Sequence, residues 1–257
     1  MRRLFLATVC CLLALPSWPS YDFVVGGDDN NFACDLGAGN TLAYPVTVAI
    51  WIKYTGHPAE RQYPVNFGNA VDSTNDSFLI RTDTTDGAFQ ATSTASAGGA
   101  TSDSFTLADP ASLDNTWFTL VAYFRSDTAR EIYVNGSTDG ANSGTRAVAE
   151  ALRYLRIGES LVGAFPFDFN IAEVAIWNSD LSGANRALYE GGTSADQIDN
   201  ANLIGYWTLD TENTTQADAS GNGGPNCTAG GTPVFDTDHP TITHAEDSTA
   251  VLRRRRN

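Results

Sequence analysis

The stretch VTVAIWIKY, residues 46–54, alternates between two sets of side chains with a period of two. In an extended strand, one face would carry the branched apolar residues Val46, Val48, Ile50 and Ile52. The opposite face would carry Thr47, Ala49, Trp51 and Lys53. Because both faces hold bulky groups, we expect this strand to lie inside a packing of two sheets rather than on a wet surface.

Similar short apolar runs recur from residue 21 to about residue 232, separated by turns rich in Gly, Asn and Asp. Their number and spacing predict an all-β, antiparallel sandwich. Only residues 182–190 are typical of a helix, with Ser182 as N-cap and Gly191 and Gly192 at the end. We therefore expect one β domain with one short helix.

The charge distribution excludes one class of partner. The 257 residues include 30 acidic and 15 basic side chains, and six of the basic ones lie at the two ends, at positions 2, 3 and 253–256. The body between them is strongly acidic and would repel phosphate groups. We therefore expect no binding of nucleic acid by the folded part.

The two ends of the chain differ from the body. Residues 1–20 combine an Arg-Arg start with the apolar run LFLATVCCLLAL, which is typical of a secretory signal peptide and too short to span a bilayer. We expect a secreted or cell-surface protein whose mature chain has no transmembrane segment. After residue 232 strand periodicity fades, so residues 233–257 are expected to form a peripheral or disordered tail.

Two cysteines remain if the leader is removed, Cys34 and Cys227. Two cysteines in an exported protein favour a disulfide, and two buried thiols are the alternative.

Five segments, in this order, resemble the laminin G-like branch of the concanavalin A-like lectin and glucanase superfamily. They are YDFVVGGDDNNFACDLG, VTVAIWIKYTG, TWFTLVAYFRSDTAREIYVNGS, LRIGES with NIAEVAIWNSDLS, and GYWTLDTENTTQADASGNGG. The resemblance implies a jelly roll of two curved antiparallel sheets with adjacent terminal strands, which also favours a bridge between Cys34 and Cys227. It further assigns four tryptophans to core or hairpin positions, namely Trp51, Trp117, Trp177 and Trp207.

The glucanase branch cleaves polysaccharides with paired carboxylates on one strand, spaced as E-x-D-x-E. The eight Glu of this chain never fall within five residues of one another, and Glu173 has Ile171 and Ala175 at the positions where an acidic partner would stand. We therefore expect no enzyme of that type. The three histidines, His57, His239 and His244, belong to loops or the tail, and we expect the last two to be solvated.

Calcium is the one cofactor that the sequence suggests. Oxygen-bearing side chains cluster in two turns, Asp28, Asp29 and Asn30 in the first, and Asp218 and Asn222 in the second. Paired terminal strands would bring these turns together. The alternative is that both clusters serve ordinary turn chemistry.

Loops at the rim of the sandwich are the expected place for a ligand. Candidate contacts combine aromatic and polar side chains, Tyr54, His57, Arg61, Tyr63, Phe165, Phe167 and Asp168. The alternative is that these residues cover the edge of the sandwich.

Taken together, these features predict a secreted, non-catalytic, lectin-like binding or adhesion module, with a carbohydrate or an extracellular protein as its ligand. Two other hypotheses stay open. One is a structural or interaction subunit of a larger surface assembly, and the other is a polysaccharide-active enzyme with an unrecognised site.

Overall fold

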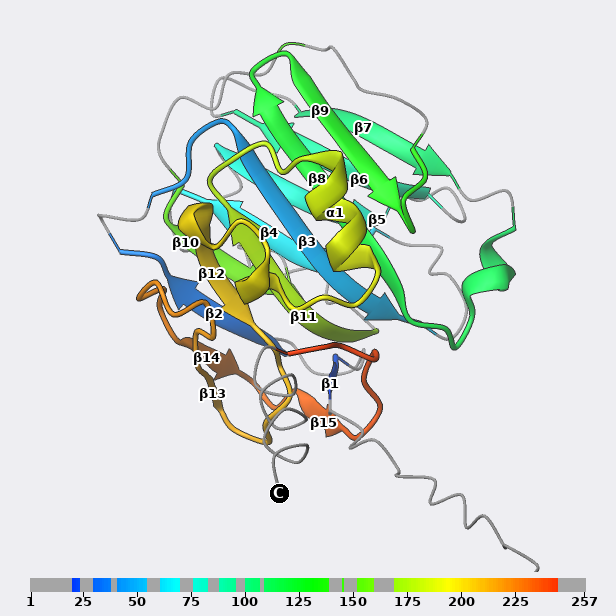
Figure 1. Ribbon diagram of the computed structural model, residues 1–257, viewed down its shortest axis with the longest axis vertical. Helices are drawn as coiled ribbons and strands as arrows, with labels where there is room; N and C mark the ends of the chain where they lie inside the picture. Colours follow the sequence, from blue (N-terminus) through cyan, green and yellow to red (C-terminus); the bar gives the residue numbers. More distant parts are fainter. Residues whose placement is uncertain are drawn as a thin grey trace, which may run out of the picture.

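The computed structural model describes residues 20–23, 30–37, 41–54, 61–69, 76–82, 88–95, 100–106, 109–138, 145, 152–159 and 169–244. Two antiparallel sheets form the body of the molecule, and one α-helix lies against them (Figure 1). This arrangement confirms the predicted all-β jelly-roll sandwich with one short helix.

The first sheet has seven strands in the order β15-β1-β11-β3-β8-β9, with β12 also paired to β11. Its strands are β1 (Ser20–Asp22), β3 (Val46–Lys53), β8 (Phe118–Ser126), β9 (Ala129–Val134), β11 (Asn170–Trp177), β12 (Leu203–Trp207) and β15 (Val234–Asp236). Strand β3, which contains most of the alternating stretch VTVAIWIKY, lies between β11 and β8.

The second sheet has eight strands in the order β13-β14-β2-β10-β4-β5-β6-β7. Its strands are β2 (Asn31–Asp35), β4 (Val65–Gly68), β5 (Ser77–Thr82), β6 (Ala88–Thr94), β7 (Ala100–Thr106), β10 (Tyr154–Ile157), β13 (Thr215–Gln216) and β14 (Cys227–Gly230). Three short 3-10 helices connect strands, η1 (Pro110–Leu113), η2 (Ala195–Gln197) and η3 (Asn200–Asn202).

Both faces of β3 are covered, as the alternation predicts. Its Val46, Val48, Ile50 and Ile52 lie in the main core between the sheets. On the opposite face, Ala49 joins a second apolar cluster and Trp51 packs against Tyr189 of the helix. This second cluster covers the outer face of the seven-stranded sheet.

The helix, α1 (Gly183–Glu190), begins and ends at the expected residues. The Ser182 hydroxyl accepts a hydrogen bond from the Asn185 backbone N–H at 3.2 Å, as an N-cap does. Gly192 follows the helix with a φ of 84°, and a side chain there would collide with the Thr241 carbonyl. Tyr189 is the helix residue buried most completely, and it anchors α1 to the sheet.

The two ends of the described chain close the sandwich. Strand β14 pairs with β2, and Cys34 and Cys227 form a disulfide with Cα atoms 4.4 Å apart across 193 residues of sequence. The predicted bridge is therefore confirmed. Of the four tryptophans assigned to core or hairpin positions, Trp177 and Trp207 are fully buried, and Trp51 and Trp117 are partly buried.

Residues 234–244 are the described part of the tail that the sequence predicted to be peripheral or disordered. Val234–Asp236 pairs with β1 at the edge of the seven-stranded sheet, and Ile242 is buried. The alternation that marks longer strands is missing here because β15 has three residues and the rest of the segment follows the surface of the body. Residues 245–257 lie outside the described residues.

The predicted leader, residues 1–20, lies outside the described residues except for Ser20, which is the first residue of β1. The leader therefore stays a prediction. No helix among the described residues is long and apolar enough to cross a membrane.

Removing the bridge with the double substitution Cys34→Ala, Cys227→Ala should lower the free energy of unfolding by about 5 kcal/mol, because the closed loop is long. Urea unfolding followed by tryptophan fluorescence measures this loss. Reductant should lower the urea midpoint of the wild type and leave that of the variant unchanged. Equal urea midpoints for the oxidised wild type and the variant would contradict the prediction.

Candidate functional site

The predicted calcium ligands that the structure describes are bonded to the protein. Both carboxylate oxygens of Asp218 accept hydrogen bonds, from the Tyr206 and Ser220 backbone N–H groups and the Ser220 hydroxyl. The Asn222 amide donates to the carbonyls of Asn200 and Leu203 at 2.7 and 2.9 Å. These contacts are the turn chemistry named above as the alternative.

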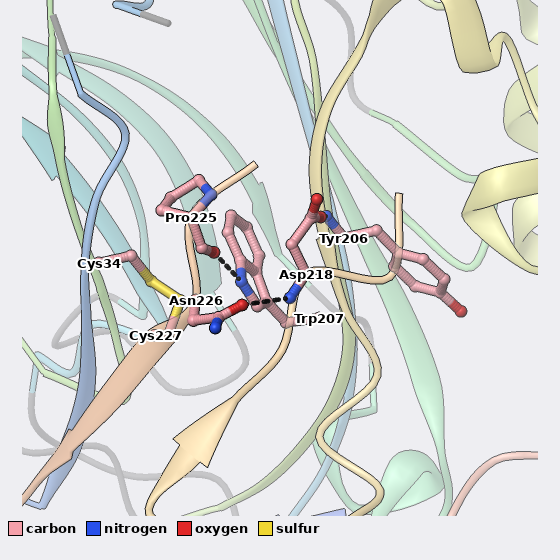
Figure 2. Close-up of a disulfide and its surroundings, with 7 residues drawn as sticks. All are labelled: Cys34, Tyr206, Trp207, Asp218, Pro225, Asn226 and Cys227. Atoms are coloured by element: carbon pink, nitrogen blue, oxygen red, sulfur yellow. Dashed lines mark hydrogen bonds between the residues drawn. A yellow bond between two sulfur atoms is a disulfide. The ribbon is translucent and has the colours of Figure 1, made fainter. Parts of the chain in front are cut away.

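The loop around Asp218 is also tied to the disulfide (Figure 2). The Asp218 backbone N–H donates to the Asn226 side chain, and the Trp207 indole donates to the Pro225 carbonyl at 3.0 Å. Cys227 of the disulfide directly follows Asn226 in the chain. The loop is thus held between β12 and β14 by protein groups.

The first turn is described only in part, since Asp28 and Asp29 lie outside the described residues. Asn30 accepts a hydrogen bond from the Thr232 backbone N–H at 2.8 Å. Within the described ranges, no group of three or more His, Cys, Asp or Glu side chains could hold a metal ion. Calcium binding stays a prediction from the sequence.

Two of the predicted rim contacts, Tyr54 and Tyr63, have buried side chains, and their role in binding stays a prediction. Tyr54 is 1% exposed, and its ring packs against Phe118 and Phe169 with centroids 5.4 and 5.1 Å apart. Tyr63 is 8% exposed. The alternation of β3, continued by one step, places position 54 on the core face with Ile52, so the sequence itself held this signal.

The remaining rim candidates are divided between described and undescribed parts of the chain. Arg61 is described and partly exposed. The other four, His57, Phe165, Phe167 and Asp168, lie outside the described residues.

A different cluster lies on the outer face of the eight-stranded sheet. Val65 and Phe67 of β4 point into the core, so Asn66 between them points outward. Asn66 lies directly opposite Arg156 of β10 on one side and Leu79 of β5 on the other. Side chains in such positions are neighbours, with Cβ atoms about 5 Å apart.

Asn66 is the unusual member of this cluster. Its side chain is fully buried, and neither its carbonyl oxygen nor its amide nitrogen has a hydrogen-bond partner in the protein. A buried polar group without a partner costs roughly 1–3 kcal/mol in folded proteins, so such groups are rare. A ligand that supplied one donor and one acceptor would remove this cost.

The polar neighbours of Asn66 are fixed by one another. Glu159, 1% exposed, accepts hydrogen bonds from the Asn31 amide at 2.8 Å and from the Arg156 guanidinium at 3.0 Å. On β5, two residues beyond Leu79, the Arg81 guanidinium donates to the Gln90 side chain at 2.8 Å. These contacts hold two guanidinium groups in place on either side of Asn66.

We call this cluster the outer-face site, and its residues are Asn31, Asn66, Arg81, Gln90, Arg156 and Glu159. Within the described part of the chain, the guanidinium groups of Arg81 and Arg156 and the carboxylate of Glu159 belong to this site, in a chain whose formal net charge is −15. Amide and guanidinium groups bind hydroxyl and carboxylate oxygens well. Among the described residues the site offers one carboxylate, whereas glycoside hydrolysis generally needs two.

The sequence patterns described above did not indicate this site. Period-two alternation in VNFG and YLRI would have placed Asn66 and Arg156 on outward faces. No pattern along the chain, however, could show that these two positions lie side by side, because β4 and β10 are separated by about 90 residues.

Comparison with known proteins identifies the fold. Residues 26–185 match a laminin G family model described as the Concanavalin A-like lectin/glucanases superfamily. No curated protein matches the chain significantly.

Three solved structures illustrate the similarity. A heptameric SAP-like pentraxin from Limulus polyphemus has a TM-score of 0.58 and 12% identity, over 90% of this chain and 100% of the pentraxin chain. A mutant NanB sialidase from Streptococcus pneumoniae has a TM-score of 0.51 and 17% identity, over 66% of this chain and 27% of its own. The botulinum neurotoxin serotype D binding domain has a TM-score of 0.52 and 14% identity, over 67% of this chain and 42% of its own. At these identities the similarity shows the fold alone.

The missing partners of Asn66 predict an unusual response to mutation. Replacing Asn66 with Leu, which has a similar shape, should leave the free energy of unfolding unchanged or raise it by up to about 2 kcal/mol, because no protein hydrogen bond is lost. The matched control is Asn170→Leu. Asn170 is also buried but donates to Asp236 at 2.9 Å, so its loss should destabilise by about 1–3 kcal/mol. Chemical unfolding of both variants gives the comparison, and a destabilised Asn66→Leu protein would refute the interpretation.

Proposed function

The chain belongs to the concanavalin A-like lectin/glucanase superfamily, and we propose that it is a non-catalytic binding module that recognises carbohydrate at the outer-face site. The leader predicted from residues 1–20 would place this module outside the cell. The likeness to solved structures concerns the fold, so the ligand class is argued from the site itself.

The observation that carries the proposal is the buried, unpartnered amide of Asn66. An amide has one group that accepts and one that donates, and a sugar hydroxyl does both. A pair of neighbouring hydroxyl groups can therefore satisfy both ends of Asn66. A binding site keeps such a costly group because a site built for a polar ligand rejects compounds that cannot pair with it.

The surrounding contacts support recognition rather than catalysis. The bonds of Glu159 to Asn31 and Arg156 hold its carboxylate in place and occupy it with two donors. The fixed guanidinium groups of Arg81 and Arg156 add donors whose geometry is set before a ligand arrives, which reduces the entropy lost on binding.

The experiment is a screen of wild-type protein on a glycan array, followed by titration calorimetry with the best ligand. The Asn66→Leu variant should bind this ligand at least about tenfold more weakly, because a tenfold loss corresponds to the removal of about 1.4 kcal/mol and one fully paired amide contributes more than that. The matched control is Asn213→Ala, whose side chain is exposed in the turn before β13 and should bind as the wild type does.

Three outcomes would count against the proposal. They are an Asn66→Leu protein that binds normally, an array without any bound glycan, and the release of reducing sugar from a polysaccharide. The second outcome would favour the protein-ligand or assembly hypothesis, and the third would favour an enzyme.

Calcium at the two turns is a separate part of the proposal. If an ion is bound there, excess chelator should lower the melting temperature of the purified protein, because a ligand selective for the folded state stabilises it. Readdition of calcium should restore the original value. An unchanged melting curve would leave Asp218 and Asn222 with their turn-forming role.

A further inference from the structure

Glu173 occupies an irregular point in the middle of β11. The pairing of β11 with β3 shifts register between Ala172 and Ala175, and Glu173 takes a φ of 56°, a conformation that side chains other than glycine rarely adopt. Its side chain is 1% exposed. Surrounding contacts must therefore hold both the backbone conformation and a buried carboxyl group.

Four residues supply these contacts. The Tyr206 hydroxyl of β12 donates to one carboxylate oxygen of Glu173, and the Tyr189 hydroxyl of α1 donates to its backbone carbonyl. The other carboxylate oxygen lies 3.1 Å from the Nε2 atom of His239, whose side chain is fully buried. The Thr208 carbonyl accepts the Glu173 backbone N–H. The expectation of a solvated His239 is thus wrong, because the tail folds back onto the bulge.

We call residues 234–244 the C-terminal strap. Its first part, β15, pairs with β1 alone and lies at the edge of the sheet (Figure 1). Its last part is held by the Thr243 backbone, which bonds to Gly192 at 2.7 Å and to Ser194 at 3.2 Å. Between these ends, Asp238 forms an ion pair with Lys53 and His239 reaches Glu173.

We propose that the C-terminal strap is a pH-sensitive latch, closed by the ion pair between His239 and Glu173 and released when the imidazole loses its proton. Release would free the edge of β1 and open the buried carboxylate to solvent. The strap is suited to this because it lies at the edge of the sheet and its ion pair between Asp238 and Lys53 includes a carboxylate whose side chain is 52% exposed, and edge segments open locally at lower cost in free energy than core strands.

The electrostatics around His239 support this direction. Burial by itself lowers the pKa of His239, but the bond to Glu173 and the backbone carbonyls of Pro240 and Thr208 outweigh it, and the net pKa is raised. A raised pKa means that the protonated pair stabilises the closed strap fully below the unfolded value of about 6.5, and that this stabilisation is lost as pH rises through the folded value.

Three other ionisable groups of the described chain near the pair, Tyr189, Tyr206 and Asp238, do not change charge in the range where His239 titrates. Burial raises the pKa of both Tyr189 and Tyr206, so these remain neutral donors. The pKa of Asp238 is lowered, because Lys53 and Trp117 outweigh the effect of burial, and this group stays ionised through neutral pH. The ion pair of Lys53 and Asp238 is therefore present in both states of His239.

Hydrogen exchange of the full chain between pH 5 and pH 9, corrected for intrinsic rates, tests the latch. Protection of the β15 amides and of Thr243 should fall at least about tenfold as pH rises through the titration of His239, while amides of β3 and β8 stay protected. The midpoint should coincide with the titration of the His239 ring followed by NMR. Protection that does not change with pH, or a midpoint that differs from that titration, would overturn the proposal.

Two variants sharpen the test. The His239→Gln side chain cannot carry a charge, so the strap amides of this variant should be weakly protected at every pH. The control is His244→Gln, which changes the other histidine of the strap. Its strap amides should show the same pH dependence as those of the wild type. A pH-dependent strap in His239→Gln, or a constant one in His244→Gln, would contradict the latch. If the amides of β3 also lose protection in His239→Gln, the substitution has destabilised the whole fold. The test then rests on the wild-type protein, in which the midpoint of the change in strap protection is compared with the titration of the His239 ring.

Discussion

The structure depends on covering both faces of the central strands of the seven-stranded sheet. Strands β3 and β11 bury one face against the eight-stranded sheet and the other beneath α1 and the segments around it. A sheet with water on one face would alternate apolar and polar residues, but here Trp51 and Trp177 stand on the outer side. Burial of apolar surface on two sides supplies the stability that the loops, rich in polar residues, cannot supply.

Closure of the chain onto itself is the second requirement. The first and last strands of the described chain lie together in both sheets, β1 with β15 and β2 with β14. The disulfide between Cys34 and Cys227 fixes the second of these pairs, and the hydrogen bonds of Asp218 and Trp207 shape the loop beside it (Figure 2). Contacts between residues so distant in sequence lose much chain entropy when they form, which explains the value of a covalent link there.

Two buried polar side chains, Glu173 and Asn66, differ in whether other residues of the protein face their polar atoms. Glu173 has one carboxylate oxygen bonded by the Tyr206 hydroxyl and the other 3.1 Å from the His239 ring, so the charge of this group faces a partner within the chain. Asn66 has no protein partner at either end of its amide. The group that faces protein partners therefore suggests an internal latch, and the group without them suggests a missing external partner.

The sequence by itself determined the all-β sandwich, the short helix and its cap at Ser182, because period-two alternation and helix capping depend on residues that are close together in the sequence. It also indicated the disulfide, since few cysteines were available to pair. It placed Tyr54 and Tyr63 at a rim where the structure has them buried, and it left Asn66, Arg156 and His239 without a role. Only the tertiary structure decided these positions, because neighbours across strands, the burial of a polar side chain and the return of the chain's end all arise from contacts between residues far apart in sequence.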